Sequence, residues 1–156
     1  MTAAPPPVEK TLWVPLDPDR AFDLFTRRIG EWWPVASHSL SASRHGSVPT
    51  SVTTEPREGG RILETCADGT IAPWATITAW EPGVRLGLDW HVGRPEAEAT
   101  RVTVRFAAEN GGTRLDLRHD GFDALPERAQ AIRDNYQTGW DLVLIERFGA
   151  AAARPA

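Results

Sequence analysis

His119 is the polar residue whose position most directly suggests chemistry. It follows Leu115 and Leu117 at steps of two, so the alternation of a strand places its imidazole on the inward, apolar face. An inward imidazole could orient a ligand carbonyl or act as a general base, because histidine titrates near pH ~6.5 when unperturbed. The alternative is that the strand ends at His119 and that the ring lies in solvent or bonds a backbone group.

Aromatic side chains form the second set of candidates. Trp32 and Trp33 stand before Pro34, where they either line the mouth of a cavity or anchor a helical turn. Tyr136 is the only tyrosine, and its hydroxyl could meet a polar group of a ligand. For Trp140, packing in the core is expected ahead of contact with a ligand. Seven tryptophans in 156 residues indicate either a heavily filled core or an aromatic-lined cavity.

The other histidines and the single cysteine predict little chemistry. His38 and His45 lie beside serines in a polar segment, residues 37–46, without a nucleophile-elbow pattern. His91 alternates onto the wet face of its strand, which indicates a surface residue. Cys66 alone cannot build a sulfur site, no His/Cys pair has a zinc-like spacing, and no glycine-rich phosphate loop opens a helix. We therefore expect no metal and no cofactor.

The composition indicates one globular domain in a reducing compartment. The formal net charge is −4 and no basic run occurs, which argues against a nucleic-acid partner. One cysteine excludes an intrachain disulfide framework and fits the cytoplasm. No apolar run approaches the ~20 residues of a membrane span, and the first residues lack the pattern of a secretory signal. The expected location is cytoplasmic.

A long helix over residues 126–149 must position several of the candidates. Pro126 suits its first turn and Gly149 suits its end. A stripe this aromatic needs a broad apolar partner, which the preceding strands can supply. The apolar positions recur at steps of three and four along one face: Ala129, Ile132, Tyr136, Trp140, Val143, Leu144 and Phe148.

The remaining elements are predicted from turn signals and from period-two alternation. Asp17 and Pro18 start a short helix that ends at Gly30, residues 31–34 form a second helical turn, and residues 37–46 form a loop. Pro73 predicts an irregular or bulged start of its strand. Strands are expected over residues 8–14, 48–55, 61–66, 70–80, 84–90, 101–106 and 114–119, and the first of them is a candidate edge strand.

This order of elements predicts an α+β domain over residues 8–149, between disordered tails at 1–7 and 150–156. The simplest arrangement curves the antiparallel sheet and lays the final helix along its concave side, with the two short helices closing one end. A cavity between sheet and helix is then expected. Arginines that alternate with apolar residues are assigned to a solvated outer sheet face that could serve a partner: Arg61, Arg85, Arg101, Arg105, Arg114 and Arg118.

Four segments together resemble a known superfamily. They are VEKTLWVPLDPDRAFDLFT followed by Glu31-Trp32-Trp33-Pro34, then GGRILETCADGT, then ITAWEPGVRLGLDW, and finally Gly139-Trp140 with Leu144. Their order over residues 8–149 resembles the Bet v 1-like, START-related superfamily, also called SRPBCC, and within it the branch named for the activator of Hsp90 ATPase homologue. The resemblance implies the helix-grip fold with a hydrophobic ligand cavity between sheet and C-terminal helix.

Three hypotheses follow. The leading one is a START-like protein that binds a hydrophobic or amphipathic small molecule or lipid. The second is a cofactor-free cyclase/aromatase-type enzyme, which requires at least two ionisable residues converging in the cavity. The third is an interaction module that contacts the chaperone Hsp90, and a homodimer is compatible with all three. No catalytic residue is assigned, and the predicted ligand-binding residues are Trp32, Trp33, Leu86, Leu88, Trp90, Val104, Phe106, Leu117, His119, Tyr136 and Trp140.

Overall fold

The computed structural model describes residues 5–125 and 128–154. Pro126, expected in the first turn of the last helix, lies outside the described residues, as do residues 1–4 and 155–156 of the two predicted tails. No helix in the described ranges combines the length and the apolar character that a membrane span requires.

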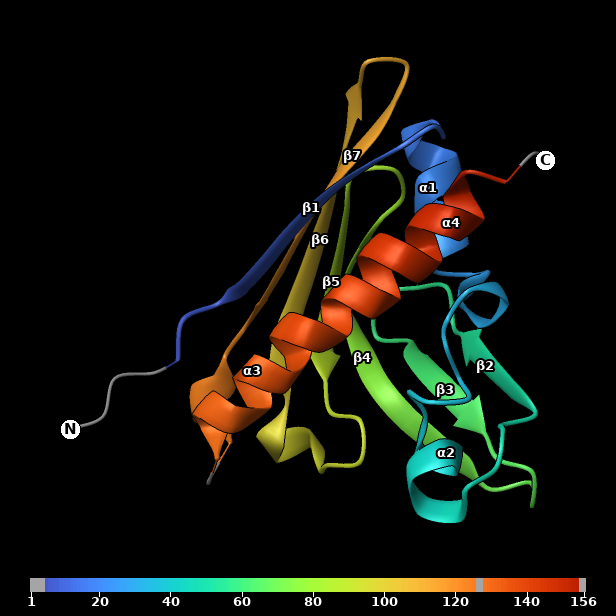
Figure 1. The fold of residues 1–156 in the computed structure, drawn as a ribbon, viewed down its shortest axis with the longest axis vertical. Helices are drawn as coiled ribbons and strands as arrows, with labels where there is room; N and C mark the ends of the chain where they lie inside the picture. The colour runs from blue at the N-terminus through green and yellow to red at the C-terminus, as the bar shows by residue number, and fades with distance from the viewer. Residues whose placement is uncertain (1–4, 126–127, 155–156) are drawn as a thin grey trace.

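One antiparallel sheet forms the body of the protein (Figure 1). The strand order is β1-β7-β6-β5-β4-β3-β2, so each strand pairs with its neighbour in sequence except β1, which joins the edge beside β7. The prediction of an edge strand at residues 8–14 is therefore confirmed. The seven strands are β1 (Val8–Val14), β2 (Ser51–Thr54), β3 (Arg61–Thr65), β4 (Ile71–Glu81), β5 (Arg85–Trp90), β6 (Thr100–Glu109) and β7 (Gly112–Asp120).

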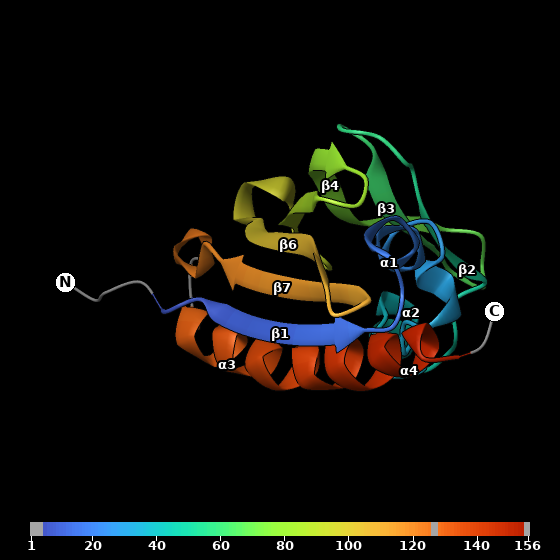
Figure 2. The same cartoon turned by 90° about the horizontal axis from the view of Figure 1, so that it is seen from above.

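A long C-terminal helix lies along the concave side of the sheet, next to β1 (Figure 2). It consists of α3 (Ala129–Trp140), a π-helical segment (Asp141–Phe148) and α4 (Gly149–Ala152). The predicted helix-grip α+β fold is confirmed. The predicted end of the helix at Gly149 is wrong, because this glycine keeps a helical φ of −56° and the alanines after it favour a helix.

A short helix and a 3₁₀ turn follow β1 in the chain, and the helix is shorter than predicted. In α1 (Pro18–Phe25), Asp17 caps the N-terminus by accepting a hydrogen bond of 2.9 Å from the Arg20 N–H, as the sequence predicts. The helix ends at Phe25, and a 3₁₀ turn follows at Ile29–Glu31. Gly30 is therefore no helix end; a Cβ at this position would lie 2.9 Å from the carbonyl oxygen of Val52, so this close approach calls for glycine.

The segment predicted as a loop over residues 37–46 contains a helix, α2 (Leu40–His45). Ser39 accepts a hydrogen bond of 3.0 Å from the Ala42 N–H, and Gly46 ends the helix with a φ of +60°. Both signals are present in the sequence, but the helix carries a single strongly apolar residue, Leu40, and so shows no amphipathic period. The prediction of a loop was therefore wrong.

Two further predictions concern irregular places in the sheet. The bulge expected at Pro73 is confirmed, since Leu63 pairs with Pro73 while Ile62 pairs with Ala75, which leaves Trp74 without an opposite residue. The prediction that His91 lies on the wet face is wrong, because only 2% of the residue is exposed. Strand β5 ends at Trp90 and the chain turns, so the alternation does not continue to His91.

A connected series of aromatic rings lies in the interior between sheet and helix. Phe25, Trp32 and Phe148 lie with ring centroids 5.1–5.4 Å apart. Trp32 continues this contact to Trp33, which in turn contacts Trp140. Such edge-to-face and tilted pairs pack large apolar areas at close distance. These rings occupy the interior between Phe25 and Trp140.

Candidate functional site

A pocket of about 310 Å³ opens where the aromatic core meets α2 and the start of the C-terminal helix. Trp74 comes from β4, Trp90 from β5 and Tyr136 from α3, and the segment from Trp33 to Ser43 supplies most of the other lining residues. We call this site the aromatic pocket. It is lined by Trp33, Ser37, His38, Ser39, Leu40, Ser43, Trp74, Trp90, Val92 and Tyr136.

Three indole rings form the deep wall of the aromatic pocket. The ring centroid of Trp33 lies 5.1 Å from that of Trp74 and 5.7 Å from that of Trp90, and the planes are tilted by 49° and 38°. Trp33 is held in place because its Nε1 donates a hydrogen bond of 2.7 Å to the His38 carbonyl oxygen. The wall is thus rigid and apolar, and it presents aromatic faces and edges to a guest.

His38 is an ionisable group on the rim of this pocket. Its Nδ1 lies 2.7 Å from the Ser37 hydroxyl. Partial burial, followed by the positive charge of Arg147, lowers the pKa of His38 below its ordinary value. The imidazole is therefore mainly neutral at pH 7, the form that can accept a proton.

Tyr136 is the second ionisable group that borders the pocket. Its hydroxyl oxygen accepts a hydrogen bond of 3.2 Å from Trp90 Nε1. Burial raises the pKa of Tyr136, so the phenol is neutral at pH 7. The hydroxyl proton donates to no acceptor among the described residues, and it remains free for a ligand oxygen.

His119 lies inward, as predicted, but it is enclosed in the core. The residue has no exposed surface, and its Nδ1 accepts a hydrogen bond of 3.1 Å from Trp140 Nε1. An indole nitrogen can only donate, so the proton of the neutral imidazole must sit on Nε2. From there it is donated to the Thr100 hydroxyl at 2.7 Å, which donates in turn to the Trp90 carbonyl at 3.3 Å.

This chain of hydrogen bonds gives His119 a structural role. It ties Trp140 of the helix to β6 and β7 of the sheet, and it leaves neither ring nitrogen free. Burial lowers the pKa of His119 to about 3, and Asp120 opposes this shift only in part. The alternative of an exposed ring or a backbone contact is wrong for His119, since both ring nitrogens face side chains.

Glu64 is the buried charge beneath the aromatic pocket, and the sequence analysis did not single it out. The residue is fully buried on β3. One carboxylate oxygen accepts from the Leu40 N–H at 2.8 Å and from Trp74 Nε1 at 2.8 Å. The other accepts from the Ser41 N–H at 2.7 Å and from the Ser41 hydroxyl at 2.5 Å. Glu64 therefore ties α2 to Trp74, and both contribute to the lining of the pocket.

The environment of Glu64 keeps it ionised. Burial by itself would raise the pKa of the carboxyl group, but the hydrogen bonds from Ser41, Leu40 and Trp74 outweigh burial and lower the pKa below its ordinary value. The N-terminus of α2 also favours a negative charge at this position.

The predicted ligand-binding residues divide into two groups. Trp33, Trp90 and Tyr136 are brought together and line the aromatic pocket. The ligand contact predicted for the others stays a prediction, since they are buried in the core and are not among the residues that line the aromatic pocket: Trp32, Leu86, Leu88, Val104, Phe106, Leu117, His119 and Trp140. Two parts of the lining were not predicted from the sequence. They are Trp74, which has no opposite residue in the strand pairing because of the bulge, and the residues of α2.

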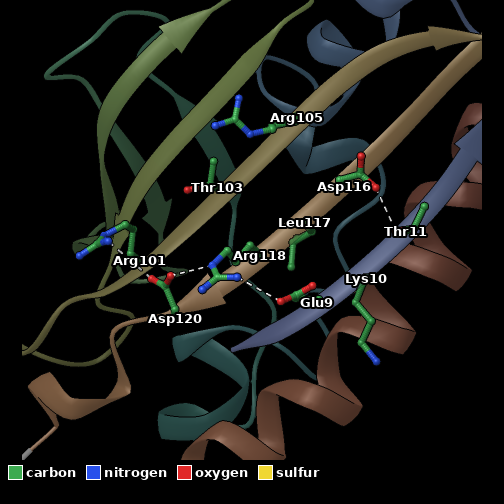
Figure 3. Close-up of a pocket in the computed structure, with 10 residues that line it drawn as sticks. All are labelled: Glu9, Lys10, Thr11, Arg101, Thr103, Arg105, Asp116, Leu117, Arg118 and Asp120. Carbon is green, nitrogen blue, oxygen red and sulfur yellow. Dashed lines mark hydrogen bonds and ion pairs between the residues drawn. The ribbon is translucent and has the colours of Figure 1, made fainter. Parts of the chain in front are cut away.

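A second hollow, of about 440 Å³, lies on the outer face of β1, β6 and β7 (Figure 3). Its charges are largely paired: Arg118 bridges Asp120 at 2.9 Å and Glu9 at 3.1 Å. Arg105 makes no ion pair with the described residues. The predicted outer position of Arg105 and Arg118 is confirmed by their exposure, whereas the partner for this face stays a prediction.

Solved structures share this architecture. An anthrahydroquino-γ-pyrone synthase is 26% identical, with a TM-score of 0.63 over 96% of this chain and 99% of that one. An AHSA1-like protein from Aeromonas hydrophila is 18% identical, with a TM-score of 0.62 over 92% and 90% of the chains. CalU16 from Micromonospora echinospora is 18% identical, with a TM-score of 0.57 over 96% and 76%. The last two show the fold alone. No curated protein matched the sequence.

The sheet that grips one long helix places this protein in the helix-grip class. The sequence model of the family described as Activator of Hsp90 ATPase homolog 1-like protein matches residues 15–153. The chain belongs to this family, as the resemblance in its sequence implies.

Glu64→Gln should lower the free energy of unfolding by about 1–3 kcal/mol, because an amide nitrogen would face a backbone N–H or an indole N–H that now donates to a carboxylate oxygen. Chemical denaturation at pH 7 measures the loss. Glu58→Gln, at an exposed position, is the matched control and should change little. Equal stability of the two variants would contradict the role of Glu64.

His119 should make the stability depend on pH in one direction. Its pKa in the folded protein is about 3, below the ~6.5 of an unfolded chain, so only the unfolded state takes up the proton between these values. The stability that this residue contributes is therefore complete above pH ~6.5 and is lost as pH falls toward 3. Imidazole ¹⁵N NMR should show the Nε2–H tautomer of His119 unchanged from pH 8 to pH 5; a midpoint within that range would refute the assignment.

Proposed function

We propose that this protein binds a compact, amphipathic aromatic molecule in the aromatic pocket. The observation that carries the proposal is the wall of three indole rings, from Trp33, Trp74 and Trp90, with Tyr136 beside them. Flat aromatic surfaces pack against such rings in tilted and edge-to-face arrangements. A guest of this kind would remove apolar area from water on both sides, at roughly 25 cal/mol per Å² before the costs of binding.

The size of the pocket favours a small guest over a long-chain lipid. Its volume of about 310 Å³ is at the lower end of the ~300–1,000 Å³ typical of ligand pockets. The aromatic packing from Trp32 to Phe148 fills the space further along the helix, where an acyl chain would have to extend. The rim supplies the polar contacts, through His38, Ser37 and the free hydroxyl proton of Tyr136.

The proposal can be tested by closing the pocket with a single side chain. Ser43 is exposed on α2 and lines the mouth, so Ser43→Trp should fill the opening without disturbing the core. Binding of naphthalene derivatives, followed by quenching of tryptophan fluorescence, should weaken at least tenfold. Ser51→Trp, exposed on the edge strand β2, is the matched control and should bind as the unchanged protein does. Equal binding by both variants would place the guest elsewhere, and no binding by the unchanged protein would end the proposal.

A second candidate function, a cofactor-free ring closure, has its own support. Two ionisable groups, His38 and Tyr136, border the same pocket, which is what the cyclase hypothesis requires. A similar structure is that of a γ-pyrone synthase. His38 would accept the proton of a ligand hydroxyl while its oxygen adds to the β-carbon of an enone, and the electrons of the C=C bond would move to the carbonyl oxygen, to which Tyr136 donates a hydrogen bond. His38 would then return the proton to the α-carbon of the enolate, so that the ligand is isomerised and nothing leaves.

2′-Hydroxychalcone is a suitable probe, because it closes to a pyranone ring by internal addition and needs no cofactor. The protein should accelerate this closure, and His38→Gln should remove about 10²-fold of the acceleration. His45→Gln, on the exposed end of α2, should leave the rate unchanged. A rate equal to that in buffer alone would leave ligand binding as the function and exclude this reaction.

A further inference from the structure

A small inner cavity lies next to the aromatic pocket and shares three of its walls. Trp90, Val92 and Tyr136 border both spaces. The inner cavity has a volume of about 10 Å³, enough for one water molecule or one oxygen atom of a ligand. It lies at the end of β5, where the chain turns after Trp90.

His91 lines the inner cavity and carries a hydrogen-bonding atom that is not used. Only 2% of the residue is exposed, and its Nε2 is buried without a hydrogen-bond partner among the described residues. The backbone of His91 is fixed, since its N–H donates to the Trp74 carbonyl at 2.8 Å and its carbonyl accepts from the Arg94 N–H at 2.9 Å. A buried imidazole nitrogen without a partner is unfavourable and rare, so the cavity is suited to a group that bonds it.

The charges around the inner cavity favour a neutral guest. Arg94 and Glu98 both border it, and they pair with each other at 3.1 Å. Thr100 already bonds His119 and the Trp90 carbonyl. Neither a carboxylate nor an ammonium group would find an unpaired opposite charge here, which leaves a hydroxyl group as the fitting chemistry.

We infer that the guest of the aromatic pocket is a hydroxylated aromatic, a phenol, whose oxygen enters the inner cavity and bonds His91 Nε2. This inference rests on the proposed binding function. Tyr136 stands between the two spaces, and its free proton is donated to the phenol oxygen. The phenol proton is donated to His91 Nε2, while the aromatic rings stay against Trp33, Trp74 and Trp90.

The test compares 2-naphthol with naphthalene, which differ only in the hydroxyl group. The unchanged protein should bind 2-naphthol about tenfold more tightly, as expected for an oxygen with two hydrogen bonds in a buried place. His91→Phe keeps a ring of similar size without polar atoms, so it should lose most of the preference for 2-naphthol and keep its affinity for naphthalene. His45→Phe is the matched control on the exposed end of α2 and should keep the tenfold preference.

A second readout uses the unchanged protein, in case His91→Phe does not fold. The imidazole ¹⁵N resonances of His91 should shift on addition of 2-naphthol and stay in place with naphthalene. Naphthalene binding without a preference for 2-naphthol, or an undiminished tenfold preference in folded His91→Phe, would overturn the inference and leave the proposed function intact. If neither compound binds, the proposed function fails, and the inference fails with it.

Discussion

The contact between the aromatic stripe of the C-terminal helix and the concave face of the sheet is the constraint on which the structure depends. Trp140 shows how specific this contact is, because its indole packs against Trp90 at 6.0 Å between ring centroids and also donates a hydrogen bond to His119. Apolar area supplies the driving force, while the chain from Trp140 through His119 and Thr100 to the sheet fixes the helix at one place. A helix held at several points cannot slide along the sheet, so the pocket beside it has a defined shape.

Glu64 has the same role on the other side of the pocket. Helix α2 is only six residues long and would not be stable alone. The buried carboxylate accepts hydrogen bonds from the N-terminus of α2 and from Trp74, so one charge holds two walls at a set distance. Removing a partner from such a network leaves other buried groups without bonds, which makes the arrangement specific as well as stabilising.

The polar groups near the pocket differ in whether they can still form a hydrogen bond to a ligand. His119 is inside the core with both nitrogens bonded and can only hold the structure together. His38 and Tyr136 line the pocket and can still hydrogen-bond a ligand, and His91 is buried next to it with a ring nitrogen that has no partner in the described part of the chain. Burial by itself does not distinguish a structural histidine from one that can meet a ligand, whereas the hydrogen-bond partners of its ring do.

The sequence by itself determined the fold class, the family, the edge strand at Val8–Val14, the bulge at Pro73 and the inward direction of His119, because period, turn residues and motifs are local or nearly so. It did not determine helix α2 or the burial of His91 and Glu64. A single apolar residue, Leu40, is not enough to form the periodic pattern that predicts a helix. The alternation of a strand does not show where the strand ends and the chain turns. Which tryptophans fill the core and which line a pocket was decided only by the tertiary structure, since both places demand the same side chains and differ only in what packs against them.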